Sequence, residues 1–194
     1  MMKRLLSKLG YLEEEPQPFL SKRVCGIWLI WVSVVILIGT LFGGSQKINM
    51  FIFNIGYFLG FVLILGNKRI YNKFAFGPPS KFQNNMTLLS IILMFILLIG
   101  MGGQFFAIQN YRMIWLSAFL AIGIHFFPFS TVHGKIMFPL AILVSINAIL
   151  GMVFPSIHFS VFAYIDVTIK TLFGIIMFLS KNPLNKSITT SVKM

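Results

Sequence analysis

Six long apolar runs, separated by short polar segments, make up most of this sequence. Each run is close to the roughly 20 residues that an α-helix needs to cross the hydrocarbon layer of a bilayer. Backbone N–H and C=O groups find no water in that layer, so a chain that crosses it must be helical or close into a barrel. We therefore predict an all-α integral membrane protein, a bundle of six transmembrane helices at 24–42, 48–65, 86–108, 113–131, 136–154 and 159–179.

The composition excludes a water-soluble globule. Only 10% of the residues are charged, compared with about a quarter in soluble domains. The net charge of +12 would suggest nucleic-acid binding in a soluble protein. Here the basic residues lie at the ends of the apolar runs, so we predict contact with the lipid bilayer and no nucleic-acid partner.

The distribution of Lys and Arg predicts the orientation. Of the 16 basic residues, Lys47 and Arg112 lie between runs on one side, and Lys170 lies inside a run. All the others lie on the opposite side of the bundle or in the two terminal segments. Because cytoplasmic loops are enriched in Lys and Arg, we expect three consecutive hairpins with both termini in the cytoplasm.

The terminal segments are expected to lie outside the six-helix domain at 24–180. In the basic segment 1–23, Leu5, Leu9 and Leu12 recur at helical spacing. This pattern is typical of a helix lying on the anionic lipids of the inner leaflet. The alternative is a basic tail that only sets the topology. Residues 181–194 are expected to be a flexible cytoplasmic tail.

Two pairs of glycines indicate close helix packing. Gly39 and Gly43 form one Gly-x-x-x-Gly pair, and Gly56 and Gly60 form another. Such pairs let two helix backbones approach each other. We expect them to pack the first hairpin internally, with formation of a homo-oligomer as the alternative.

The clearest candidate site lies in the sixth run. Asp166 and Lys170 are four residues apart, so they share a helix face and can pair. They lie about 10 and 16 Å into the run, too deep to reach either surface easily. Charges at this depth are usually paired, neutralised or near water, and many are functional. The functional interpretation is a cation or proton site, and the structural one is a salt bridge that fixes packing.

His125 is the second candidate, in the fourth run. It shares a helix face with Ser117 and Ala121, and Pro128 is expected to kink or loosen the helix beyond it. Histidine can relay protons, and it could line a polar cavity with Asp166 and Lys170. The alternative is a neutral histidine that hydrogen-bonds to a nearby carbonyl. Two ways of aligning the helices place His125 at different depths, and the sequence does not choose between them.

The sequence contains no signature of catalysis. It has no His-Glu-x-x-His metal motif, no Gly-x-Ser-x-Gly nucleophile turn and no phosphate-binding glycine loop. Outside Glu13–Glu15, Asp166 is the only acidic residue, and Cys25 is the only cysteine. Paired-carboxylate chemistry inside the membrane, an intramolecular disulfide and a cysteine-based metal site are therefore excluded. We expect no enzyme, no cofactor and no metal.

The segment 123–129, Gly-Ile-His-Phe-Phe-Pro-Phe, resembles a Gly-x-His-Phe-x-Pro helix motif of small, uncharacterised bacterial multi-spanning membrane proteins. The resemblance covers this helix best. It implies a bacterial inner-membrane protein with His125 and Pro128 in the family pattern, and it implies no substrate. The residues themselves lead to two hypotheses. One is a small transporter, channel-like or ligand-binding protein with a polar site among the fourth to sixth helices. The other is a structural or regulatory protein, an assembly partner or immunity-type protein, whose polar groups only specify packing.

Overall fold

A computed structural model describes residues 9–11 and 18–184. In these residues the chain forms seven α-helices and no strand. The helices are α2 (Lys22–Leu41), α3 (Met50–Gly60), α4 (Lys68–Phe74), α5 (Lys81–Leu97), α6 (Tyr111–His133), α7 (Met137–Val153) and α8 (Phe159–Phe178). Turns of π-helix continue α3 through Phe61–Leu65 and α5 through Leu98–Gly102. The prediction of an all-α fold is confirmed.

Helix length and composition support several membrane crossings. Four helices of the described chain are long and apolar enough to cross a bilayer: α2, the continuous segment Lys81–Phe105, α6 and α8. Met50–Leu65 and α4 add a fifth if they are counted together as one span, with a bend of 66° between them. The apolar helix α7 has 17 residues. The chain is therefore a helical membrane protein with four, or up to five, helices of spanning length.

Side-chain caps explain why some helices begin before the apolar runs. The predicted run starts at Met86, whereas α5 starts at Lys81. The Ser80 hydroxyl accepts a hydrogen bond from the Gln83 N–H, and the Gln83 side chain accepts one from the Ser80 N–H. This reciprocal capping box satisfies donors that the first helical turn leaves free. Asn110 caps α6 by accepting from the Met113 N–H, so that helix also begins before the predicted run.

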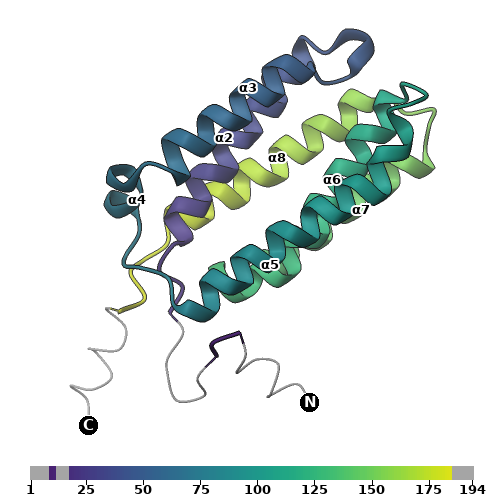
Figure 1. Cartoon of the computed structure of the whole chain (residues 1–194). Helices are drawn as coiled ribbons and strands as arrows, with labels where there is room; N and C mark the ends of the chain where they lie inside the picture. Colours follow the sequence, from purple (N-terminus) through teal and green to yellow (C-terminus); the bar gives the residue numbers. More distant parts are fainter. Residues whose placement is uncertain (1–8, 12–17, 185–194) are drawn as a thin grey trace.

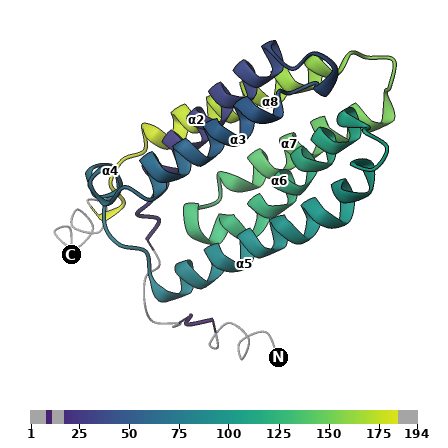
Figure 2. The same cartoon turned by 45° about the horizontal axis from the view of Figure 1, so that its top comes forward.

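The long helices form two layers. Figure 2 shows α2, α3 and α8 in one layer and α5, α6 and α7 in the other. In space the helices follow the order α3, α2, α8, α7, α6, α5, so the first long helix lies beside the last. The close approach of α2 and α8 depends on glycines. A Cβ added to Gly26 would lie 2.6 Å from the Gly174 carbonyl oxygen, which leaves no room for a side chain.

Two buried apolar clusters fill the space between the layers. The first, here the outer cluster, joins α2, α6, α7 and α8 around Ile36, Leu116, Phe119 and Phe162. The second, the inner cluster, joins the same four helices nearer to the start of α2 and the end of α8, around Leu29, Val144 and Met177. Large side chains therefore hold the layers together, and the polar residues described below lie between the clusters.

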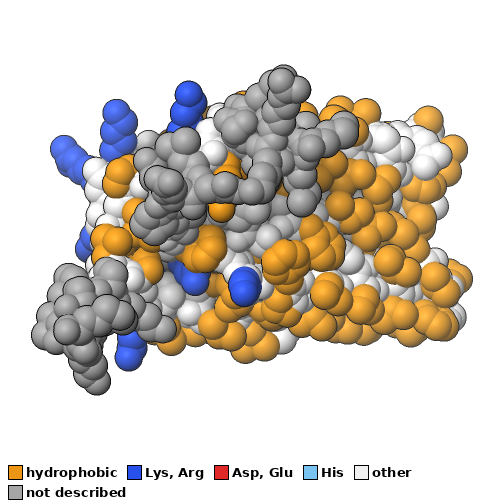
Figure 3. Space-filling model, turned by 90° about the horizontal axis from the view of Figure 1, so that it is seen from below, with side chains coloured by type: hydrophobic (Ala, Val, Ile, Leu, Met, Phe, Trp, Pro, Cys, Tyr) orange, Lys and Arg blue, Asp and Glu red, His pale blue; other side chains and the backbone are white. Residues whose placement is uncertain are grey.

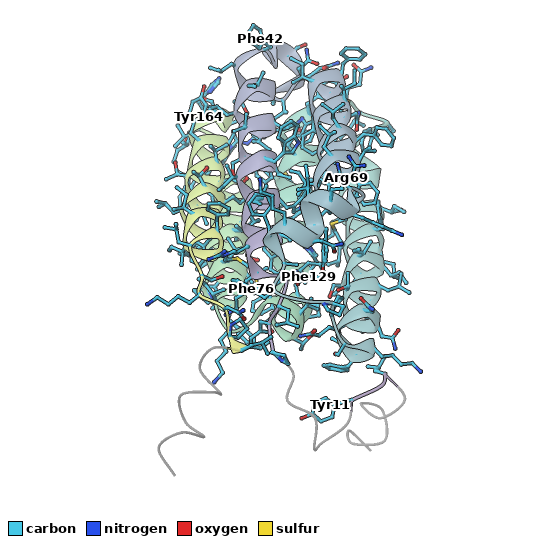
Figure 4. All side chains as sticks on the ribbon, turned by 90° about the vertical axis from the view of Figure 1, so that its left-hand side faces the viewer. Tyr11, Phe42, Arg69, Phe76, Phe129 and Tyr164 are labelled. Atoms are coloured by element: carbon cyan, nitrogen blue, oxygen red, sulfur yellow. The ribbon has the colours of Figure 1, made fainter. Side chains whose placement is uncertain are left out.

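The end at which α2 begins and α8 ends is rich in Lys and Arg, and we call it the basic end. Figure 3 shows these side chains gathered toward one side of the molecule, with hydrophobic side chains over much of the rest of the visible face. Its residues are Lys22, Arg23, Lys68, Arg69, Lys73, Lys81, Lys135 and Lys181. In Figure 4, Phe76 and Phe129 lie toward the basic end, and Phe42 lies at the opposite end.

Arg112 fastens the opposite end of the bundle. Its guanidinium group donates hydrogen bonds to the carbonyl oxygens of Gly151, Phe154 and Ile157, at 2.6, 3.0 and 2.8 Å. The first two of these carbonyls belong to the last turn and the C-cap of α7, which have no helical N–H partners. Arg112 therefore caps α7 and holds the α7–α8 connection against the start of α6.

The predicted terminal segments lie mostly outside the described residues. Of the expected surface helix in residues 1–12, only Leu9, Gly10 and Tyr11 are described. The Tyr11 ring packs edge-on against the Phe82 ring at the start of α5, with 5.2 Å between the ring centres. Of the expected tail at 181–194, residues 181–184 are described.

Candidate functional site

The buried face of α8 carries the only acidic residue of the part of the chain that the structure describes. Asp166 is 0% exposed and Lys170 is 1% exposed. On the N-terminal side of the pair, Phe162 and Ala163 of α8 belong to the outer cluster. On its C-terminal side, Met177 belongs to the inner cluster. The two charged residues therefore lie between the clusters, close to the middle of α8.

Asp166 and Lys170 form a closely paired salt bridge. The Lys170 Nζ atom lies 2.8 Å from Oδ1 and 2.6 Å from Oδ2 of Asp166. The spacing of four residues brings both side chains over the same turn of the helix. Separating the pair would be costly, because a single charge left in a buried site costs several kcal/mol.

Phe119 of α6 covers the cationic side of the pair. Lys170 Nζ lies 5.0 Å from the centre of the Phe119 ring, a cation–π contact. Phe119 itself is 1% exposed, so the ammonium group is shielded from lipid and water by an aromatic ring. This contact could not be predicted from the sequence, because Phe119 lies on another helix and is one of 22 phenylalanines.

Neighbouring helices place polar groups near the pair. The Asn147 side chain of α7 donates a 2.9 Å hydrogen bond to the Phe162 carbonyl oxygen, one turn before Asp166. This bond ties α7 to the turn of α8 that carries the acid. On α2, Ser33 is 1% exposed and donates to the Leu29 carbonyl oxygen. Because α2 and α8 are antiparallel and Gly26 meets Gly174, Ser33 lies at the level of the ion pair.

His125 is buried on α6, closer to the basic end than the pair. It lies six residues beyond Phe119, or about 9 Å along the helix. Its Nδ1 atom lies 2.6 Å from the Ile122 carbonyl oxygen. A carbonyl can only accept, so Nδ1 carries the proton, and in the neutral ring Nε2 keeps a free lone pair.

A row of rings continues from His125 to the basic end. The ring centres of His125 and Phe129 are 5.2 Å apart, and those of Phe129 and His133 are 5.0 Å apart. Residues four apart lie on one face of α6, so this row follows the helix. At its end the Ser21 hydroxyl lies 3.3 Å from Nδ1 of His133. His125 and His133 are both buried, so buried ionisable groups occur from the pair to the basic end.

The sequence of this chain matches a known protein family. A model of a family of unknown function, DUF6609, matches residues 12–187, which include all the helices described above. The chain belongs to the DUF6609 family. No curated protein and no solved structure matches it. The family gives no activity, so the chemistry of the site has to be argued from the residues themselves.

In this DUF6609 protein the predicted glycines lie at different contacts. Gly56 and Gly60 of α3 face Val35 and Trp31 of α2, and a Cβ on Gly56 would lie 2.7 Å from the Val35 side chain. The Trp31 indole N–H donates to the Gly56 carbonyl oxygen at 2.8 Å. Gly39 instead lies against Ile48, in the connection between α2 and α3, and Gly43 lies against Lys47 in the same connection.

A close contact between Gly123 of α6 and Ser145 of α7 was not predicted from the sequence. A Cβ on Gly123 would clash with the Ser145 hydroxyl and lie 2.9 Å from the Ser145 backbone nitrogen. The Ser145 oxygen is buried and has no hydrogen-bond partner among the described residues. Gly123 and Ser145 are both visible in the sequence. Their contact could be recognised only if α6 and α7 were already known to face each other.

The arrangement limits the chemistry of the site. No group of three His, Cys, Asp or Glu residues that could hold a metal occurs in the described residues. The structure pairs a carboxylate with an ammonium group, and it places the His125 imidazole, with one free nitrogen, nearer to the basic end on α6. Such groups can exchange protons or bind a small cation at the carboxylate if Lys170 moves away.

Proposed function

We propose that this protein is a six-span transporter or channel-like membrane protein whose charge-carrying group is Asp166. Lys170 acts as the internal counter-ion, and His125 relays or orients protons between the pair and the basic end. The substrate of the site is a proton or a small cation. The observation that carries this proposal is an ion pair at mid-helix, 0% and 1% exposed, with no other charged group bonded to it in the described chain.

In this proposal α3 and α7 also cross the membrane, in addition to the four helices of spanning length. The 17 residues of α7 correspond to about 25 Å of helix and lie at the lower end of the range for transmembrane helices. Since α7 packs between α6 and α8 in one bundle, it would cross the bilayer alongside them. The enrichment of Lys and Arg at the basic end favours a cytoplasmic location for both termini. The plasma membrane as the location rests on the resemblance of residues 123–129 to bacterial inner-membrane proteins.

Two features support a site that can change state. Pro128 lies inside α6 and has no N–H to donate to the Ile124 carbonyl oxygen, so the helix lacks one backbone hydrogen bond next to His125. In addition, π-helical turns occur in the continuations of α3 and α5, and such turns are frequent at functional sites. A movement of Lys170 away from Asp166 would expose a carboxylate to a proton or cation arriving along the row of His133, Phe129 and His125.

A structural role is the second candidate, and one observation favours it. Both carboxylate oxygens of Asp166 bond to the same Lys170 ammonium group, and Phe119 closes the remaining side. A pair satisfied in this way can fix the packing of α8 without binding a ligand. In this alternative the protein is a structural or regulatory membrane protein.

Thermal stability of the detergent-purified protein distinguishes the two functions. Wild type and Asp166→Asn are compared across pH, monovalent cations and a metabolite library, with Asn54→Ala as a control on the exposed face of α3. For a transport site, a proton or cation shifts the midpoint of wild type and of Asn54→Ala, and the shift disappears in Asp166→Asn that is still folded. If nothing shifts the wild type and Asp166→Asn only melts earlier, the pair is structural.

A further inference from the structure

The short helix α4 leaves the bundle at the basic end. It follows the π-helical turn Phe61–Leu65 and is bent by 66° from the preceding helix. Asn67 begins the new helix by accepting hydrogen bonds from the Arg69 and Ile70 N–H groups. Figure 1 shows α4 beside the start of α2 and the end of α8. This geometry is expected of a segment that lies along a membrane surface instead of crossing the membrane.

The side chains of α4 divide into two sets. Lys68, Arg69 and Lys73 are exposed, whereas Ile70 and Tyr71 are partly buried. In the described chain, none of the three cations forms an ion pair, because the only described carboxylate, Asp166, is bonded to Lys170. The cationic side of α4 therefore has no neutralising group within the described protein.

The end of α4 and the connection that follows it form a pocket of about 350 Å³ that opens to the surface. It is lined by Tyr71, Asn72, Ala75, Phe76, Gly77, Pro78 and Pro79. This volume lies within the roughly 300–1,000 Å³ of small-molecule sites. The lining is mainly apolar, and Tyr71 and Asn72 are its residues with polar side-chain groups. The Phe76 N–H donates to the Leu20 carbonyl oxygen at 2.9 Å, which fixes the pocket against the start of α2.

Arg23 of α2 brings a positive charge against Phe76, one of the residues that line the pocket. Its guanidinium carbon lies 4.6 Å from the centre of the Phe76 ring. The Arg23 Nε–H donates to the Ser180 carbonyl oxygen at 2.9 Å, and the other guanidinium N–H groups have no partner among the described residues. Arginine with free N–H groups is well suited to bind the oxygens of a phosphate.

We propose that this pocket, with Arg23 and the cations of α4, binds the phosphate headgroup of an anionic phospholipid. A lipid is favoured over free phosphate because exposed apolar side chains lead directly to the bend: Phe61 is 51% exposed and Leu65 is 37% exposed. Acyl chains lying along these side chains would bring the headgroup to α4. The site is separate from Asp166 and Lys170, so it stands or falls independently of the proposed transport function.

The test measures how lipids stabilise the delipidated protein in detergent. Dioleoyl phosphatidylglycerol, dioleoyl phosphatidylcholine and inorganic phosphate are each titrated while the unfolding midpoint is recorded. Wild type is expected to be stabilised by phosphatidylglycerol and much less by the other two. Arg23→Gln is expected to need about tenfold more phosphatidylglycerol for the same shift, the effect of losing one hydrogen bond to a charged group.

Two further variants keep the test decisive if Arg23→Gln fails to fold. The double variant Lys68→Gln/Arg69→Gln removes exposed charges of α4, and the control Lys47→Gln removes a charge at the opposite end of the bundle. The proposal requires the double variant to weaken the phosphatidylglycerol effect and the control to leave it unchanged. Equal stabilisation by both lipids, an unchanged double variant, or full replacement of the lipid effect by inorganic phosphate would overturn it.

Discussion

The middle of α8 and the basic end handle charge in opposite ways. In the middle, one carboxylate and one ammonium group lie 2.6 Å apart and are almost fully buried. At the basic end, cations such as Lys68, Arg69 and Lys73 are exposed, and none of the three pairs with a carboxylate of the described residues. The difference follows from the surroundings. A buried charge must be neutralised by another protein group. A surface charge can be hydrated by water, screened by salt or paired with a lipid phosphate.

Breaking the buried pair should have the largest effect. Lys170→Met leaves the Asp166 carboxylate buried without its partner, and we expect a loss of about 3–5 kcal/mol in the free energy of unfolding. The double variant Asp166→Leu/Lys170→Met removes both charges and should recover most of that loss. Unfolding midpoints in detergent measure both. If the single and double variants are equally unstable, the cost comes from altered packing and the electrostatic explanation is wrong.

The contrast between the buried pair and the basic end also depends on tight packing of the helices. A loosely packed interior could admit water and solvate the pair. Gly123→Ala tests this, because the new Cβ would clash with the Ser145 side chain and lie 2.9 Å from its backbone nitrogen. Overpacking of this kind should cost about 1–3 kcal/mol, measured as a lower unfolding midpoint. The matched control is Gly100→Ala, which has nothing within 4 Å of the added Cβ. Gly100→Ala should be neutral or slightly stabilising, because Ala favours a helix more than Gly does. A similar loss in both variants would show that the close packing at Gly123 is not the cause.

The smallest effect is expected at the basic end. Lys68→Gln/Arg69→Gln should change the free energy of unfolding in a neutral detergent by less than about 0.5 kcal/mol, because these exposed side chains have no charged partner to lose. Unfolding midpoints at low and high salt provide the measurement. A large loss of stability would mean that α4 is held by its charges, and the contrast with α8 would then be false.

Much of the fold could be predicted from the sequence, because the apolar runs are long. The helical class follows from them, and the fourth run at 113–131 corresponds to α6 at Tyr111–His133. Helix ends were less predictable, since they depend on caps such as Ser80 and Gln83 that precede the apolar residues. The bend after Leu65 was also not predicted, because a π-helical turn has no clear sequence pattern.

The candidate site could be predicted only within one helix. Asp166 and Lys170 are neighbours through helical spacing alone, and the structure shows them paired. Contacts between helices depend on which helices are neighbours, and hydropathy does not specify this. Phe119 over Lys170 and Asn147 on the Phe162 carbonyl are of this kind. For the same reason, the two alignments of His125 could not be distinguished from the sequence.

The pairing of α2 with α8 has a consequence for how the chain assembles. Gly26 packs against Gly174, about 150 residues later in the sequence. At a synthesis rate of roughly 5–20 residues per second, the ribosome needs roughly 7–30 s to reach that partner. During this time α2 must be accommodated by lipid, by α3 or by the insertion machinery. The central contact of the bundle is therefore among the last to form, and a chain truncated before α8 lacks the surface on which its first helix is built to pack.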